Sequence, residues 1–268
     1  MAEVEQVVEA SLTKLIRVLD RRERIPALET LAVAVKGVYP EISLAASAIV
    51  LDANVFLRIP SHKKSSDIMD YLTGPHEKPI VVPGQIIQEF WNNHLSAVDT
   101  VYKTVSKKHQ EMSKEVEKYK LSGVAGVEPV AEAIEAFRAN NEHIFEPELM
   151  SKTSGFLERL VEKAIVPFAP RAPLAEIAMH RKRAKTPPGF KDEGDGDFLV
   201  WTDLLWGLLE AQEEGMSFDN VILVSNDAKV DWSRGKSAHP LLVAELKATL
   251  NAHFTIWNLD QLADAIAN

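Results

Sequence analysis

The sequence contains no cysteine among its 268 residues. This absence excludes disulfides, thiolate nucleophiles and zinc–sulfur sites, and it is compatible with a reducing compartment. The first ten residues, MAEVEQVVEA, lack the basic-then-apolar pattern of a secretory signal. No apolar run approaches the roughly 18 residues that cross a bilayer, because Lys36 and Asp52 interrupt the best candidates. We therefore expect a cytoplasmic protein that does not associate with membranes.

Positive charge is also scarce. The chain has 30 lysine and arginine residues against 39 aspartate and glutamate residues, which gives a net charge of −9 at pH 7. This balance argues against a protein that coats nucleic acid through its overall charge. It does not exclude an enzyme whose acidic site is neutralised by metal ions. The basic residues gather in short segments, such as 103–110 and 180–185, and any one of these taken alone is more typical of a solvated helix face or loop.

Apolar residues recur at steps of three and four from Val4 to Leu19, which predicts an amphipathic helix. A second apolar segment, ALETLAVAVKGV, predicts another helix that ends before YPEIS. We interpret residues 1–44 as a helical N-terminal appendage. Its 4–19 segment is a candidate for dimerisation or for docking a partner, and simple packing on the rest of the protein explains it equally well.

The rest of the chain alternates between apolar runs and helical patterns. The runs at 46–51, 79–82, 221–225 and 254–257 are typical of strands buried on both faces. The segment AIVPFAP, residues 164–170, fits either a short strand or an extended connector. Such alternation predicts an α/β fold with a mainly parallel sheet. We expect this domain to span residues 45–268, with a long helical insertion at about 97–186.

Acidic residues follow several of these runs. Asp52 comes directly after the first strand, Asp227 follows VILVSN, and Glu89 lies about one turn into the helix after PIVV. A dense acidic cluster at 192–197 precedes an apolar helix and contains Asp192, Asp195 and Asp197. Sites in open α/β sheets form at the carboxyl ends of the strands. Carboxylates that converge there need a counter-charge, and Mg²⁺ or Mn²⁺ would supply it.

Each acid also has a simpler explanation. Asp197 precedes a helix and is a candidate N-cap. Asp227 and Asn226 fit a turn after the strand, and an isolated Glu89 is typical of an exposed helix face. Asp52 is harder to explain in this way, because a charge inside a buried apolar run is unfavourable unless it is paired.

Five segments, in this order, resemble the PIN-like nuclease group that is often found in bacterial defence and toxin-like contexts: VLDANVFL, IVVPGQIIQEFWNN, PPGFKD, GDFLVW and ILVSNDAKVDW. The resemblance covers roughly residues 46–258. It implies a three-layer α/β/α fold and a metal-dependent ribonuclease. By position, Asp52, Glu89, Asp197 and Asp227 match the four core carboxylates. Asp192 would be an accessory acid or a loop-fixing residue, and Asp195 would replace or supplement Asp197.

The resemblance leads us to expect an endoribonuclease with one or two Mg²⁺ or Mn²⁺ ions. Glu89 would orient or deprotonate the attacking water, and the other three acids would hold metal. Substrate contacts are expected from the following residues: Asn54, Asn226, Lys107, Lys108, Arg181 and Arg183. A protein inhibitor or antitoxin-like chain and a homodimer are the expected partners besides RNA.

Two other functions remain open at this point. LDANVF followed by NDAKVD loosely resembles the haloacid-dehalogenase phosphatases, although Asn54 stands where those enzymes have a second aspartate. The other alternative is a non-catalytic domain that binds RNA or a protein and keeps its acids for structural reasons.

Overall fold

The computed structural model describes residues 2–56, 58–142, 149–226, 229–235 and 237–267. Within these ranges, the side chains of residues 2–8, 56, 90, 93–104, 149 and 150 are not described.

A five-stranded sheet forms the centre of the protein. Its strand order is β3-β2-β1-β4-β7, and every neighbouring pair is parallel. The strands are β1 (Ser47–Leu51), β2 (Ile80–Val81), β3 (Ala164–Ile165), β4 (Asn220–Val224) and β7 (His253–Trp257). Every residue of β1 and β4 is buried, as the near-continuous apolar runs predicted. The segment 164–170 begins with a strand, β3, which settles the question that the sequence left open.

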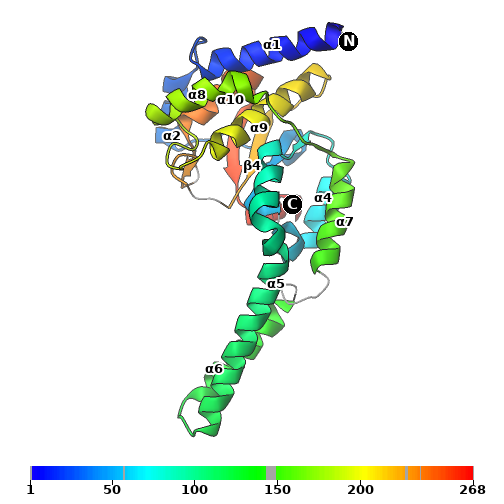
Figure 1. The fold of residues 1–268 in the computed structure, drawn as a ribbon, viewed down its shortest axis with the longest axis vertical. Helices are drawn as coiled ribbons and strands as arrows, with labels where there is room; N and C mark the ends of the chain where they lie inside the picture. The colour runs from blue at the N-terminus through cyan, green and yellow to red at the C-terminus, as the bar shows by residue number, and fades with distance from the viewer. Residues whose placement is uncertain (1, 57, 143–148, 227–228, 236, 268) are drawn as a thin grey trace.

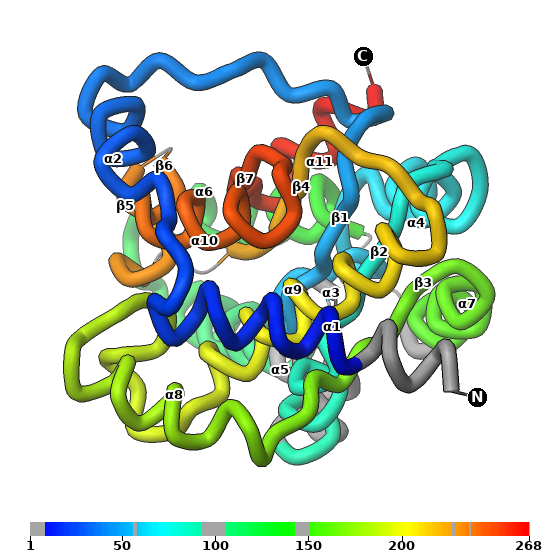
Figure 2. The backbone as a smooth tube through the Cα atoms, turned by 90° about the horizontal axis from the view of Figure 1, so that it is seen from above, coloured from blue at the N-terminus to red at the C-terminus, as the bar shows by residue number. Residues whose placement is uncertain are grey.

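Helices cover both faces of this sheet (Figure 2). Helices α4 (Ser65–Thr73) and α11 (Leu259–Ala267) contact each other on one face. Helices α9 (Gly196–Glu213) and α10 (Pro240–Leu250) contact each other on the opposite face. Most residues of α9 are buried, which explains why its sequence is apolar around most of the helix. The predicted three-layer α/β/α architecture is confirmed.

Helix α1 (Ala2–Leu19) packs on the outside of the second helical layer, where it contacts α8, α9 and α10. Leu15, Val18 and Leu19 are fully or almost fully buried. Helix α2 (Ala27–Lys36) has far fewer buried side chains and lies against α10. The two N-terminal helices therefore differ, since α1 completes the core while α2 remains largely exposed.

Helices α5 (Gly84–Leu121) and α6 (Val127–Asn140) form an arm that projects away from the sheet (Figure 1). At 1.5 Å per residue, α5 is roughly 57 Å long. His109 of α5 is buried, and its ring nitrogen Nε2 lies 3.2 Å from the carbonyl oxygen of Ile134 in α6. The chain then returns through α7 (Leu149–Val161), which contacts α4.

The segment predicted as an insertion, 97–186, also contains parts of the core. Strand β3 pairs with β2, and α8 (Arg171–Arg183) contributes the buried Leu174 and Ile177 to the hydrophobic core. The sequence did not separate these pieces from the arm, because β3 is only two residues long. Shorter elements were also not predicted: α3 (Ala53–Phe56), the 3₁₀ turns Leu44–Ala46 and Ile59–Ser61, and the hairpin of β5 (Ser233–Arg234) and β6 (Ser237–Ala238). Among the described residues, no helix combines the length and apolar character needed to cross a bilayer.

Candidate active site

A cavity of about 190 Å³ opens at the carboxyl ends of the central strands. Three of the predicted acids, Asp52, Glu89 and Asp197, line this cavity together. The other described residues of its wall are Ala53, Asn54, Val200, Leu223, Ser225, Lys229, Trp232 and Ile256. The fold thus gathers acids from three distant segments around one small space.

Asp52 is held in place by the end of β1. Its backbone N–H donates to the carbonyl of Val224 at 3.1 Å, which extends the pairing with β4 by one residue. Its carboxylate Oδ1 accepts from the backbone N–H of Ala53 at 2.7 Å. Oδ2 accepts from Asn54 Nδ2 at 2.7 Å and from Ser225 Oγ at 2.6 Å. These donors aim the carboxylate at the cavity and stabilise its charged form.

Glu89 reaches the cavity from the beginning of α5. Gln85 Nε2 donates to Glu89 Oε1 at 3.0 Å, while the backbone N–H of Gln85 donates to the buried Asp203 Oδ2 at 2.8 Å. A Cβ atom at Gly196 would lie only 2.6 Å from Glu89 Oε1. Glycine is therefore needed at this position for the carboxylate to approach the first residue of α9. Glu89 is half-buried against a helix N-terminus, which favours negative charge, and is not an isolated surface glutamate.

Asp197 lies in the first turn of α9. The N-cap residue of this helix is Asp195, whose side chain makes no capping bond, so the N-cap interpretation of Asp197 is wrong. Asp197 Oδ2 accepts from Lys229 Nζ at 3.0 Å and from Trp232 Nε1 at 2.9 Å. Burial raises the pKa of Asp197 from 3.8 to about 6, although the bonds from Trp232 and Lys229 act in the opposite direction.

Lys229 supplies positive charge to this acidic site. Its ammonium also donates to Asp192 Oδ2 at 2.7 Å, and this bond is the main reason that the pKa of Asp192 lies below its usual range. Desolvation tends to lower the pKa of Lys229, but its hydrogen bonds to Asp192 and Asp197 outweigh that effect and raise it. Asp192 is therefore joined to the cavity through Lys229 and does not line the cavity itself.

The loop before α9 is fixed by contacts on both sides. The backbone N–H of Gly189 donates to Asp231 Oδ2 at 2.9 Å, and Asp231 is fully buried. Gly189 has φ +81°, and a Cβ there would lie 3.0 Å from Asp197 Cβ, so its position needs glycine for two reasons. Lys182 of α8 donates to the backbone carbonyl of Glu193. The acid-rich loop is thus tied down by Asp231 and Lys182 while it delivers Asp197 to the cavity.

Like Asp192, the predicted Asp195 does not line the cavity, and it is exposed. Asp227 lies outside the described residues. Its neighbour Asn226 accepts from the backbone N–H of Leu259 through Oδ1, and its own N–H donates to Asn54 Oδ1 at 3.0 Å. Asn226 therefore links the ends of β1 and β4 to the start of α11, while Asn54 also lines the cavity.

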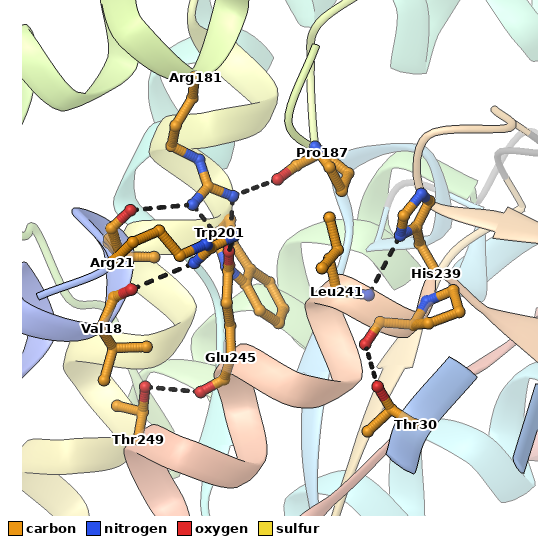
Figure 3. A network of polar contacts seen from close by, with 12 residues as sticks. Val18, Arg21, Thr30, Arg181, Pro187, Trp201, His239, Leu241, Glu245 and Thr249 are labelled. Carbon is orange, nitrogen blue, oxygen red and sulfur yellow. Dashed lines mark hydrogen bonds and ion pairs between the residues drawn. The ribbon is translucent and has the colours of Figure 1, made fainter. Parts of the chain in front are cut away.

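The predicted phosphate-binding residues occupy three different environments. Lys107 and Lys108 are exposed on the arm, roughly 27 Å along α5 from Glu89. Arg183 is exposed at the end of α8. Arg181 corrects the prediction, because its side chain is 5% exposed and binds the fully buried Glu245 with Nη1 at 2.8 Å. Figure 3 shows this guanidinium directed into the interior toward Glu245 and Pro187, where it cannot contact a substrate.

The donor set of the cavity suits a hard divalent cation in kind, since carboxylate oxygens from three segments border one space. As the side chains stand, however, no group of three or more histidine, cysteine, aspartate or glutamate residues in the described ranges is arranged to hold a metal ion. Lys229 already neutralises part of the charge. A cation bound between Asp52, Glu89 and Asp197 would therefore share Asp197 with this ammonium or displace it.

A family model described as a PIN-like domain matches the chain in two overlapping segments, residues 48–165 and 131–245. Together these matches cover well over half of the sequence. The chain belongs to the PIN-like domain family. This membership gives the protein a nuclease-type fold, and PIN-like nucleases generally use divalent metal ions. No curated protein and no solved structure matches the chain at a significant level.

Sequence reasoning did not place Lys229 or Ser225 in this PIN-like site, and it did not predict the contact of Trp232 with Asp197. Lys229 and Trp232 both lie within the segment SNDAKVDW, but their bonds to Asp197 depend on how the chain turns after β4. Ser225 ends the apolar run VILV, and its hydroxyl reaches Asp52 only because β4 pairs with β1. The signal for all three was their nearness to Asn226 and Asp227 in the sequence.

Proposed function

We propose that this protein is a metal-dependent endoribonuclease that hydrolyses RNA phosphodiester bonds. The observation that carries this proposal is the common cavity of Asp52, Glu89 and Asp197 at the carboxyl ends of parallel strands, in a chain of the PIN-like family. Asp227 of the adjoining segment is the fourth acid of the proposal. A divalent ion, Mg²⁺ or Mn²⁺, would supply an activated water and polarise the scissile phosphate.

Side chains of the cavity would bind the cation, activate the water and contact the phosphate. Asp52 and Asp197 would hold the cation, because both carboxylates are aimed into the cavity by fixed donors. Glu89 would orient or deprotonate the attacking water, since its other neighbours are an amide and a helix N-terminus. The Lys229 ammonium lies beside Asp197, where it would hold a non-bridging phosphate oxygen close to the reacting centre.

The basic residues of the arm suit a longer RNA. Lys107 and Lys108 are exposed on α5, at a distance from Glu89 that several nucleotides would span. Arg183 provides a further exposed cation on α8. We propose a cytoplasmic role as a toxin or defence effector, in which a protein inhibitor controls access to the cavity.

The test is cleavage of labelled RNA in the presence of Mn²⁺ by the wild type and by Asp52→Asn. We expect cleavage by the variant to fall by about 100-fold or more, because the amide removes a charge that the cation needs. The matched control is Asp219→Asn. Asp219 is exposed at the amino end of β4, on the opposite edge of the sheet, so this change should leave cleavage unaffected.

Equal cleavage by the wild type and Asp52→Asn would contradict the proposal. A chromogenic phosphate monoester in the same assay tests the phosphatase alternative. We expect no hydrolysis of it, because position 54 is an asparagine whose amide group is bonded to Asp52 and to the backbone of residue 226. Metal-independent binding of RNA without cleavage would instead support the non-catalytic alternative.

A further inference from the structure

A second cavity, of about 270 Å³, adjoins the candidate active site at the carboxyl ends of β4 and β7. Ser225 and Ile256 belong to the walls of both cavities. The hydroxyl of Ser225 also donates to Asp52 Oδ2 at 2.6 Å, so the shared wall lies against the first acid of the site. A group attached to a phosphate in the acidic cavity is therefore within reach of this second cavity, which we call the side pocket.

The side pocket differs from the acidic cavity in its chemistry. Its described wall contains three serines, two asparagines, one glutamine and Trp257, and no charged side chain. A phosphate bound there would meet no positive side chain of the described residues, and burying an unpaired charge is unfavourable. Such a wall suits a neutral ligand that has a flat face and several hydrogen-bonding groups.

Three amide side chains of the side pocket are oriented by backbone groups. Asn226 Oδ1 accepts from the backbone N–H of Leu259 at 3.2 Å. Asn258 and Gln261 form a capping box at the start of α11, in which each side-chain oxygen accepts from the other residue's backbone N–H at 2.8 Å. No described residue accepts a hydrogen bond from the three amide nitrogens. Each amide therefore keeps its NH₂ group as a donor for a ligand.

Trp257 supplies a flat apolar surface to the same pocket. Its carbonyl accepts from the backbone N–H of Ser225 at 2.8 Å, and its side chain packs against the hydrophobic core while remaining partly exposed. Trp201, Trp206 and Trp232, in contrast, are at most 7% exposed. The rings of these three tryptophans are used inside the protein, whereas the ring of Trp257 borders a pocket next to the acids.

An aromatic surface and a set of amide donors in a neutral pocket form the combination that recognises an unpaired nucleobase. The ring stacks on the face of the base, and the amide nitrogens donate to carbonyl oxygens and ring nitrogens on its edge. Both contacts need a base that is free of the stacking and pairing of a duplex. The phosphate attached to the same nucleotide would lie toward the acidic cavity.

We propose that the side pocket binds the base of an unpaired nucleotide directly next to the scissile phosphate. Trp257 stacks on this base, and Asn226, Asn258 and Gln261 donate to its edge. The position of the scissile phosphate rests on the proposed nuclease function. The side pocket adds a requirement that the substrate is single-stranded at this nucleotide.

Binding of a short labelled single-stranded RNA, followed by fluorescence anisotropy in EDTA, tests the proposal without metal-dependent cleavage. We expect Trp257→Ala to weaken binding by about 10-fold, and Trp257→Phe, which keeps a ring, to weaken it much less. The control is Tyr119→Ala, which removes a ring that is 52% exposed near the far end of α5 and should bind as the wild type does. A fully paired RNA duplex should bind the wild type and Trp257→Ala equally.

Asn258→Asp gives a second measurement that does not depend on replacing a partly buried ring. Aspartate keeps the oxygen that caps α11, but it replaces the NH₂ donor with a charged acceptor. We expect this change to weaken binding of the single-stranded RNA by about 5-fold or more. Asn251→Asp is the matched control, because Asn251 is exposed between α10 and the amino end of β7, and its binding should not change.

Unchanged binding in both Trp257→Ala and Asn258→Asp would overturn the proposal, and so would an equal loss of binding for duplex RNA. Cleavage of the same RNA in Mn²⁺ separates this proposal from the nuclease function. A wild type that binds RNA through Trp257 and Asn258 but does not cleave it leaves the base site standing and contradicts the nuclease. A wild type that cleaves RNA no better than these two variants, with equal binding, leaves the nuclease standing and overturns the base site.

Discussion

Two groups of buried or half-buried acids in this protein differ in how their oxygens are satisfied. Glu245 is fully buried and accepts from Arg21, Arg181 and the indole of Trp201 (Figure 3). Asp203 is also fully buried, and its oxygens accept from Arg171 and from two backbone N–H groups. At the cavity, the Lys229 ammonium donates to both Asp192 and Asp197, so its charge is divided between two carboxylates.

The difference separates acids that stabilise the fold from acids that are available for chemistry. Glu245 faces one arginine that is itself buried and a second that is partly exposed, so its charge is balanced within the chain. Asp197 is held above its ordinary pKa by burial despite its donors. A bound cation would stabilise the ionised form of a carboxylate such as Asp197, whose pKa is raised by burial. Glu245 is already paired with two arginines.

The largest expected effect is the loss of stability when the charge of the buried Glu245 is removed. Glu245→Gln should lower the free energy of unfolding by about 3–5 kcal/mol, because it leaves the buried Arg181 without its counter-charge. Asp197→Asn should change the same quantity by no more than about 1 kcal/mol, since losing a poorly solvated charge offsets losing the bond to Lys229. Urea denaturation of both variants at neutral pH measures the contrast.

Equal losses of stability in these two variants would remove the distinction between structural and functional acids. Arg181→Met combined with Glu245→Gln is the control. With both charges changed, we expect part of the lost stability to return, because the double variant no longer buries an unpaired guanidinium. If the loss of unfolding free energy in the double variant equals the sum of the losses in Glu245→Gln and in Arg181→Met, the two side chains do not act together.

Much of the fold was predictable from the sequence because its central elements are strongly patterned. The strands β1 and β4 are almost continuous apolar runs, and the helix α9 is mostly apolar along its 18 residues. The elements that the sequence missed or left open are short: α4 has nine residues, and β3, which fitted a strand or a connector, has two. Their formation depends on pairing with β2 and packing on α11, which is information that a local pattern does not contain.

The site was predictable in part for a related reason. Asp52 and Glu89 follow recognisable strands, so the rule that sites form at carboxyl ends of parallel strands located them. The role of Arg181 was predicted wrongly, because a basic run looks the same whether its members face solvent or the interior. Tertiary contacts decide that Arg181 points inward, where it donates to Glu245 of α10 and to the carbonyl of Leu19 at the end of α1.

The buried His76, which does not line the cavity, gives a second and smaller expected effect, on the pH dependence of stability. Its side chain is 4% exposed, and burial lowers its pKa from 6.5 to about 4. The unfolded chain therefore binds a proton first as the pH falls below 6.5, and the folded protein loses stability down to about pH 4. We expect this group alone to contribute a loss on the order of 3 kcal/mol across that window.

The measurement is the free energy of unfolding of the wild type and of His76→Phe between pH 7 and pH 4. Carboxylates titrate in both proteins, so the difference between the two curves isolates the histidine. We expect the wild type to lose stability faster than the variant as the pH falls. Parallel curves would mean that His76 is as accessible to protons in the folded protein as in the unfolded chain.

The smallest expected effect concerns the close contact between Glu89 and the start of α9. Two glycines of the acidic loop, Gly196 and Gly194, provide the test variant and its control. Gly196→Ala would place a methyl group 2.6 Å from Glu89 Oε1, whereas Gly194→Ala meets its nearest described atom only at 4.0 Å. The first change should push the Glu89 carboxylate away from α9 and lower Mn²⁺-dependent RNA cleavage by about 10-fold. The end of a flexible side chain can move, so stability should change little. Gly194→Ala should leave cleavage intact. A similar loss of cleavage in both variants would mean that the loop is disturbed by any added side chain. In that case the contact with Gly196 would not be what positions Glu89.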